Sequence, residues 1–142
     1  MSNFAIIYWS GTGNTEAIAE ILKHEISKAN HNAVITPVSK ASIEMVDNCD
    51  VLVLGCPAMG SEELEDSEMQ PFVESIKPLI NGKKIALFGS YDWGDGEWIR
   101  IWHLDMVEAK AKVFNEDLFV KGYPDEEKQD LCVNFALKLC NF

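Results

Sequence analysis

Three short apolar runs constrain the fold of this chain more than any other feature of its sequence. They cover residues 4–9, 51–56 and 84–90, and few polar side chains interrupt them. A strand that is apolar along both faces is typical of a parallel sheet with helices on either side. Between the runs lie segments whose apolar residues recur at helical spacing. This alternation predicts an α/β fold with a doubly wound parallel sheet.

The complete alternation contains five strands and five helical segments. The two further strands are expected at residues 32–36 and, in two pieces, at residues 113–114 and 118–120. The helices are expected around the apolar stripe that starts at Ile18, from Ser42, around Met69, over residues 97–112, and from Asp125 almost to Phe142. Ligands of such sheets bind beyond the carboxyl ends of the strands, which places loops 10–15, 57–68 and 91–97 at the expected site.

Length and composition indicate one soluble domain. With 142 residues the chain can bury one core but not two, so we expect a single domain over residues 1–142. No apolar run approaches the roughly 18 residues that a membrane helix needs. The N-terminus also lacks a basic region followed by a cleavable apolar core. These features predict a cytoplasmic protein that does not enter a membrane.

The cysteines and histidines do not suggest a metal site. The four cysteines form no C-x-x-C pair, and the three histidines are isolated from one another. Cys132 and Cys140 share an apolar helical stripe, so we expect them to be buried thiols. No metal is therefore predicted.

The formal net charge of −11 at pH 7 narrows the range of partners. It argues against nucleic acid and against anionic membranes, both of which it repels. It favours basic protein partners instead. It also opposes the binding of any anion, so a phosphate site on this chain must rely on local donors.

The loop after the first apolar run has the composition of a phosphate site. It joins a strand to an amphipathic helix, so main-chain N–H groups and the positive end of the helix dipole converge there. No Lys follows its glycines, which excludes a Walker A loop, and Glu16 replaces the third glycine of the dinucleotide-binding fingerprint. Neutral donors without a cation suit a terminal phosphate monoester. The loop consists of Ser10, Gly11, Thr12, Gly13, Asn14 and Thr15.

The loops after the third and fourth strands each place one large apolar side chain in a polar, glycine-containing turn. Met59 stands in residues 57–62, and Trp93 stands in residues 91–96. Either side chain alone could simply fold back over the core. On neighbouring loops beside a phosphate site, the two indicate the walls of a slot for a flat aromatic ring. A phosphate at one end and a flat ring at the other describe a mononucleotide such as FMN.

The three loops together resemble those of the short-chain flavodoxins of anaerobic bacteria. The resemblance rests on residues 8–15, 54–60 and 86–96, and it extends over essentially the whole chain. It implies the flavodoxin-like strand order 2-1-3-4-5 and one non-covalently bound FMN. It also implies an electron carrier that moves single electrons between redox enzymes, with no catalytic residues and no substrate of its own.

Position by position, the resemblance assigns the contacts with the cofactor. The first loop would hold the phosphate, Met59 would lie on the inner face of the flavin ring, and Trp93 would lie on its outer face. Glu62 would accept a hydrogen bond from flavin N3–H. The cofactor-binding residues of the second and third loops would be Pro57, Ala58, Met59, Gly60, Ser61, Glu62, Ser90, Tyr91, Asp92, Trp93, Gly94 and Asp95.

Two residues depart from the flavodoxin pattern. Ser61 stands where Gly, Asn or Asp is usual, and because Ser tolerates positive φ poorly, we expect a turn that does not require it there. Asp92 stands where Gly is common and adds a negative charge beside the ring. Repulsion from the crowded carboxylates of the two loops is expected to give the carrier a low reduction potential. These carboxylates belong to Glu62, Glu63, Glu65, Asp66, Glu68, Asp92, Asp95 and Glu97.

Three other functions use the same fold. A small FMN-dependent quinone reductase needs a substrate pocket and usually a longer chain, and a flavodoxin-like ribonucleotide reductase activator is a specialised interaction protein. A phospho-acceptor signalling domain needs acidic residues where this chain has Trp9-Ser10 and Cys56-Pro57. The expectation is therefore a monomeric carrier that docks transiently on basic-surfaced redox enzymes.

Overall fold

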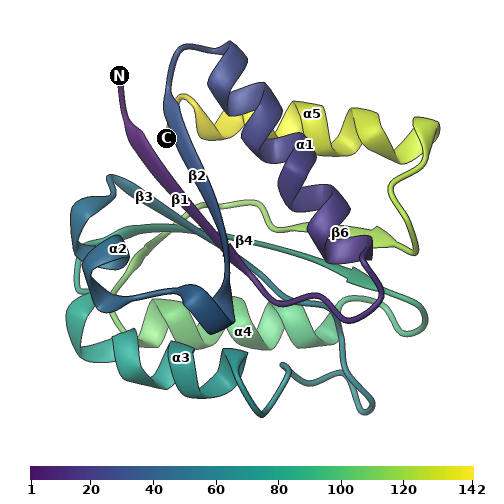
Figure 1. The fold of residues 1–142 in the computed structure, drawn as a ribbon. Coiled ribbons are helices and arrows are strands. Elements are labelled where there is room, and N and C mark those ends of the chain that lie inside the picture. The colour runs from purple at the N-terminus through teal and green to yellow at the C-terminus, as the bar shows by residue number, and fades with distance from the viewer.

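The computed structural model describes the whole chain, Met1–Phe142, and contains one sheet. The strand order is β2-β1-β3-β4-β5, and every strand pair is parallel (Figure 1). This confirms the order 2-1-3-4-5 expected from the sequence. The strands are β1 (Asn3–Tyr8), β2 (Asn32–Pro37), β3 (Val51–Gly55), β4 (Lys84–Tyr91), β5 (Lys112–Val113) and β6 (Leu118–Lys121).

The strands β5 and β6 together occupy the fifth position of the sheet. β5 pairs with Lys84 and Ile85 at the start of β4, and β6 pairs with Phe88 through Tyr91 at its end. Residues 114–117 interrupt the pairing between them. The split fifth strand predicted from the sequence is thus confirmed.

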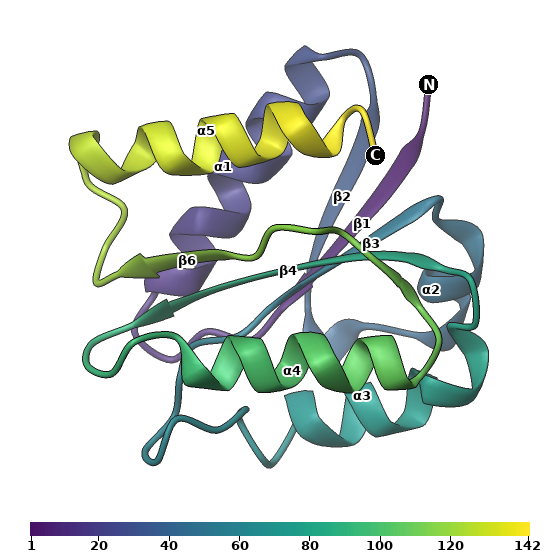
Figure 2. The ribbon, with the colours of Figure 1, turned by 180° about the vertical axis from the view of Figure 1, so that it is seen from behind.

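Helices cover both faces of the sheet (Figure 2). The two faces carry separate apolar clusters, one under α1 and α5 and the other under α2, α3 and α4. Two short 3-10 turns, Val38–Lys40 and Lys77–Leu79, follow β2 and α3. The helices are α1 (Asn14–Lys28), α2 (Ile43–Asn48), α3 (Met69–Ile76), α4 (Glu97–Glu108) and α5 (Glu126–Leu139).

The strand β1 shows why the apolar runs are continuous. Phe4, Ile6 and Tyr8 face the α1–α5 cluster, whereas Ala5 and Ile7 face the opposite one. Because side chains alternate between faces, a strand with a core on each side is apolar at every position. None of the helices is both long enough and apolar enough to cross a bilayer.

Two helix boundaries differ from the sequence-based expectation. α4 ends at Glu108 rather than at residue 112, because Lys110 adopts a left-handed φ of 68° and Lys112 already belongs to the sheet. α1 begins at Asn14, so the last two residues of the predicted loop 10–15 belong to the first turn of the helix. α5 ends at Leu139, which agrees with the expected helix that runs almost to Phe142.

Candidate functional site

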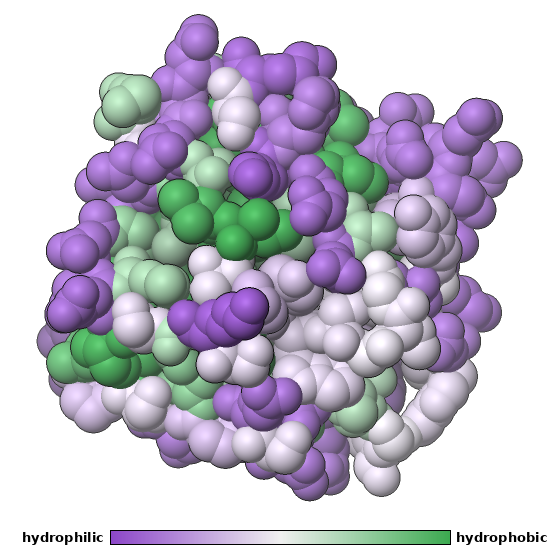
Figure 3. Space-filling model, viewed as in Figure 1, coloured by the Kyte–Doolittle hydropathy of each residue, from purple (hydrophilic) through white to green (hydrophobic).

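Three loops meet at the carboxyl edge of the sheet, after β1, β3 and β4. They enclose a hollow of about 170 Å³. Figure 3 shows pale residues of intermediate hydropathy gathered on this side of the molecule, at the lower right, with strongly hydrophilic residues around them. The hollow is lined by Trp9, Ser10, Gly11, Thr12, Asn14, Thr15, Pro57, Ala58, Met59, Ser90, Tyr91 and Asp92.

The first loop presents unpaired donors at the N-terminus of α1. The hydroxyl oxygen of Ser10 accepts hydrogen bonds from Gly13 N–H at 3.1 Å and from Glu16 N–H at 3.3 Å, so it caps the helix. The N–H groups of residues 11, 12, 14 and 15 donate to no acceptor within the protein. Free N–H groups at the positive end of a helix dipole form an anion-binding site.

A buried pair of hydroxyls joins this loop to the sheet. Thr15 Oγ1 and Ser90 Oγ lie 2.7 Å apart, and both residues are almost fully buried. The main chain of Ser90 is held in turn by Ala58 N–H, which donates to Ser90 C=O at 2.9 Å. One residue of β4 therefore contacts both the first and the second loop.

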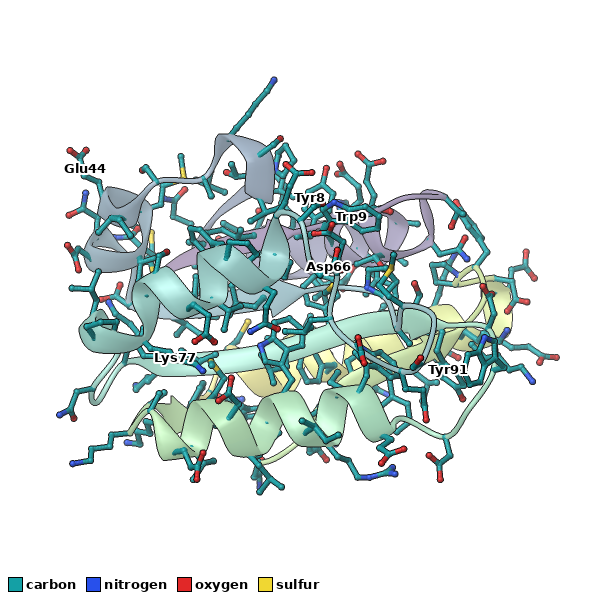
Figure 4. All side chains as sticks on the ribbon, turned by 90° about the horizontal axis from the view of Figure 1, so that it is seen from below. Tyr8, Trp9, Glu44, Asp66, Lys77 and Tyr91 are labelled. Atoms are coloured by element: carbon teal, nitrogen blue, oxygen red, sulfur yellow. The ribbon has the colours of Figure 1, made fainter.

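Two aromatic residues at the end of β1 fasten the first loop to its neighbours (Figure 4). Trp9 Nε1–H donates to Glu68 Oε1 at 3.1 Å, which ties this loop to the one after β3. Tyr8 O–H donates to Glu16 Oε2 at 2.9 Å. Burial, together with this bond to Glu16, raises the pKa of Tyr8 to about 12. Sequence reasoning missed these pairings, because nothing local links Trp9 to a carboxylate 59 positions away.

The second loop is closed by a two-way main-chain bridge. Met59 N–H donates to Glu63 C=O at 2.9 Å, and Glu63 N–H donates to Met59 C=O at 3.1 Å. Positive φ falls on Gly60, at 25°, and on Glu62, at 56°. Ser61 does not adopt a positive φ, as expected for a residue with a Cβ.

The second and third loops touch through Glu62 and Gly94. A Cβ on Gly94 would lie 2.3 Å from Glu62 Oε1 in its present position, and the φ of 89° at Gly94 also favours glycine. The same Oε1 atom is buried and has no hydrogen-bond partner. An unpaired buried acceptor is costly unless a donor reaches it. Glu62 Oε1 is therefore poised to accept a hydrogen bond from a group that enters between the two loops.

The structure does not bring all of the expected site residues into the hollow. Trp93 is 60% exposed and points to solvent beside it, whereas Met59 contributes to its wall. Asp95 pairs with Arg100, whose Nη2 lies 3.1 Å from Asp95 Oδ1. The expected residues that do not line the hollow are Gly13, Gly60, Ser61, Glu62, Trp93, Gly94 and Asp95.

Glu65 has a different role from the other carboxylates of the second loop. It is buried, and its Oε1 accepts from Glu68 N–H at 2.7 Å and from Met69 N–H at 2.9 Å, at the start of α3. Its Oε2 accepts from the N–H and the hydroxyl of Ser67. Burial alone raises the pKa of Glu65, but the bonds from Ser67, Met69 and Glu68 outweigh it and lower the pKa. Its charge is thus compensated locally and anchors the loop.

The thiols do not form a reactive centre. Burial raises the pKa of Cys56 to about 12 and that of Cys132 to about 11, so both stay protonated near neutral pH. No group of three or more His, Cys, Asp or Glu side chains lies close enough to bind a metal ion.

Comparisons with known proteins agree on one family. The model of the flavodoxin family matches residues 6–135. A flavodoxin from Clostridium beijerinckii is 46% identical over 136 residues, which cover 96% of this chain and 98% of that protein. A flavodoxin from Megasphaera elsdenii is 48% identical over 120 residues, which cover 84% of this chain and 87% of that protein.

Solved structures agree as well. The solution structure of two-electron reduced Megasphaera elsdenii flavodoxin has a TM-score of 0.84 and 39% identity, and the match covers 95% of this chain and 98% of that one. The crystal structure of oxidised flavodoxin 2 from Bacillus cereus has a TM-score of 0.88 and 30% identity over 99% of both chains.

The buried carboxylate of Glu65 predicts an acid-sensitive anchor. Its pKa in the folded protein lies below the ordinary value of 4.5, so it stabilises the fold fully above that pH. This contribution disappears as the pH falls through the folded-state pKa. We expect Glu65→Gln to lower the free energy of unfolding by about 1–3 kcal/mol at pH 7. The difference in unfolding free energy between the variant and the wild type should become smaller in acid. Urea unfolding at several pH values measures this difference, and a difference that stays constant down to acid pH would contradict the assignment.

Proposed function

This chain belongs to the flavodoxin family, and we propose that residues 1–142 form one FMN-binding unit in which the three loops hold the cofactor. As a flavodoxin it binds FMN and carries electrons, and it is not an enzyme with a substrate of its own. The quinone reductase and ribonucleotide reductase activator alternatives are not favoured. The main support for the proposed site is the set of unpaired N–H donors at the start of α1, next to the hydroxyls of the first loop.

The phosphate end of the site fits FMN. We assign the phosphate to the free N–H groups of the first loop and to its hydroxyl and amide side chains. The bonds at Ser10 leave its hydroxyl hydrogen free, and Thr12 makes no side-chain hydrogen bond within the protein. These neutral donors and the dipole of α1 must overcome a net charge of −11, because no Lys or Arg lines the hollow. The residues of this end are Ser10, Gly11, Thr12, Gly13, Asn14 and Thr15.

The ring end of the site lies between the second and third loops. The hollow of about 170 Å³ is smaller than the roughly 300 Å³ at which ligand pockets begin. Because Glu62 packs against Gly94 there, we infer that the ring end forms when these loops move apart. Glu62 Oε1, which has no partner within the protein, would then accept a hydrogen bond from the flavin N3–H. The residues of this end are Pro57, Ala58, Met59, Gly60, Ser61, Glu62, Ser90, Tyr91, Asp92, Trp93, Gly94 and Asp95.

Bound FMN supplies the reversible uptake of single electrons, and the protein determines its environment. Met59 and Trp93 would exclude water from the two faces of the ring. Carboxylates of the second and third loops would oppose the addition of negative charge, which lowers the reduction potential. Glu65 is an exception, since its charge is already compensated by four hydrogen bonds.

Redox partner proteins follow from the carrier function, and we propose that they are basic at the docking surface. The surface beside the ring carries Asp92 and Asp95, and the whole chain has a net charge of −11. Such a surface steers basic partners into an encounter complex and releases them again quickly. We also propose that the protein acts as a monomer in the cytoplasm, where its flavin edge stays open to successive partners.

The phosphate assignment predicts a specific loss of FMN affinity. We expect Thr12→Ala to raise the dissociation constant about 10- to 100-fold, because one hydrogen bond to a charged acceptor is lost. Thr12→Ser keeps the hydroxyl and should bind FMN like the wild type. Titration of apoprotein into FMN, followed by flavin fluorescence, measures both constants. Equal affinities of the Ala and Ser variants for FMN would show that the Thr12 hydroxyl does not bind the phosphate.

The charge of Asp92 is predicted to lower the reduction potential of the bound flavin. A charge about 10 Å from the ring, at an effective dielectric constant of about 40, changes the potential by about 35 mV. We therefore expect a rise of this size in Asp92→Asn, measured by anaerobic redox titration. The control is Glu44→Gln, at the end of the molecule opposite Tyr91 in Figure 4. A shift that is equal in both variants would refute a local effect.

Docking through charge attraction predicts that the rate of electron transfer depends strongly on salt concentration. The rate of electron transfer to a basic-surfaced haem protein should fall as ionic strength rises from about 0.01 to about 0.5 M, because screening removes the attraction. Transfer to an uncharged small-molecule acceptor is the control and should change little. Stopped-flow absorbance measures both rates, and a rate to the basic protein that ignores salt would speak against this mode of docking.

A further inference from the structure

A second hollow lies outside the three-loop site, between α3 and α4. It measures about 610 Å³, and we call it the α3–α4 groove. Figure 4 shows the two helices side by side, with Lys77 between them. Glu62 and Glu63 of the second loop line it as well, so it runs up to the edge of the flavin site.

The walls of the α3–α4 groove are acidic. Six carboxylates line it, and Lys77 is its only cationic side chain. Lys77 is already paired, with Nζ 2.6 Å from Glu74 Oε2 and 2.9 Å from Asp105 Oδ1. Four carboxylates thus remain without a cation in the groove. They belong to Glu62, Glu63, Asp66 and Glu108.

The groove also exposes aliphatic side chains. Ile101 and Leu104, one turn apart on α4, line it and are 57% and 65% exposed. Its floor contains the buried rings of Trp98 and Trp102. A patch of apolar side chains rimmed by charge is typical of an interaction surface.

Two residues of the groove each carry one buried atom without a hydrogen-bond partner. These atoms are Trp102 Nε1 and Glu62 Oε1, of which the second lies against Gly94 and is already assigned to the flavin. Buried polar groups in proteins are nearly always paired, so the unpaired Trp102 Nε1 is unusual for a residue of the groove wall. The groove itself combines negative charge with exposed aliphatic surface.

We propose that the α3–α4 groove is a second docking surface that binds a basic amphipathic helix of a partner protein. α4 has 12 residues, about 18 Å of helix, so its length matches three turns of a partner helix. Aliphatic residues of that helix would cover Ile101 and Leu104, and its Lys or Arg side chains would meet the unpaired carboxylates. The groove repels anionic lipid and nucleic acid for the same electrostatic reason.

This proposal rests on the carrier function but not on docking at the flavin edge. Contacts at Asp92 and Asp95 would bring the partner's redox centre near the ring. A partner helix in the α3–α4 groove would instead attach the partner beside the ring, with one end of that helix near Glu62. A partner that used both surfaces would bind with an affinity that depends on contacts at each of them.

The test uses the FMN-loaded protein, labelled with ¹⁵N, and a synthetic helical peptide with Leu at heptad core positions and Lys elsewhere. We expect amide shifts concentrated in α3 and α4 and binding that weakens with salt. Ile101→Ser with Leu104→Ser should weaken binding by about tenfold or more, because both aliphatic contacts are lost. Leu137→Ser is the matched control, since Leu137 on α5 is 48% exposed and lies outside the groove. All variants should keep the FMN content and visible spectrum of the wild type.

Four results would overturn the proposal. They are absence of peptide binding, shifts confined to residues 91–97, an unchanged affinity in the double variant, and equal binding of a peptide with Glu in place of Lys. Each leaves FMN binding intact and so separates this proposal from the proposed function, whose failure would appear as loss of the flavin itself.

Discussion

The parallel register of β1, β3 and β4 is the constraint on which the functional surface depends. Tyr8 pairs with Gly55, and Gly55 pairs with Phe88, so β1 and β3 end level, whereas β4 continues to Tyr91 beyond the same edge. Each of the three loops therefore starts at the same edge. A shift of two residues in one strand would move its loop by about 7 Å along the sheet and separate the donors of the first loop from the second and third. The helices on both faces hold this register, because each strand contributes to two cores.

In the proposed site, local neutral donors would let an acidic protein bind an acidic cofactor. The first loop gathers N–H groups and hydroxyls without a single cation, and Ser10 uses its oxygen to shape the loop while its hydrogen remains available. Glu65 follows the same principle, because its carboxylate is likewise surrounded by neutral donors. Under this proposal, short-range hydrogen bonds would decide cofactor binding, whereas the long-range field of the net charge would act on partner proteins.

Glu62 links the two surfaces of the molecule. Its carboxylate stands against Gly94 at the proposed flavin site, and the same residue lines the α3–α4 groove. In the proposed site its unpaired oxygen would contact a cofactor group on one side, while its loop forms the end wall of the groove on the other. A helix seated in the groove would therefore press on a loop that also contacts the ring. Cofactor and partner would share one structural element.

The sequence by itself determined the architecture, because strand and helix periodicities are local signals. It specified the parallel sheet, the split fifth strand and the three loops. The resemblance of those loops to the loops of short-chain flavodoxins predicted FMN as the cofactor. It also predicted that Ser61 avoids positive φ, a property of a single residue. Only the tertiary structure decided that Glu65 is buried, that Trp9 reaches Glu68, that Trp93 faces solvent, and that α3 and α4 leave a groove. Each of these depends on which side chains meet across the fold, and a local pattern in the chain carries no information about such distant neighbours.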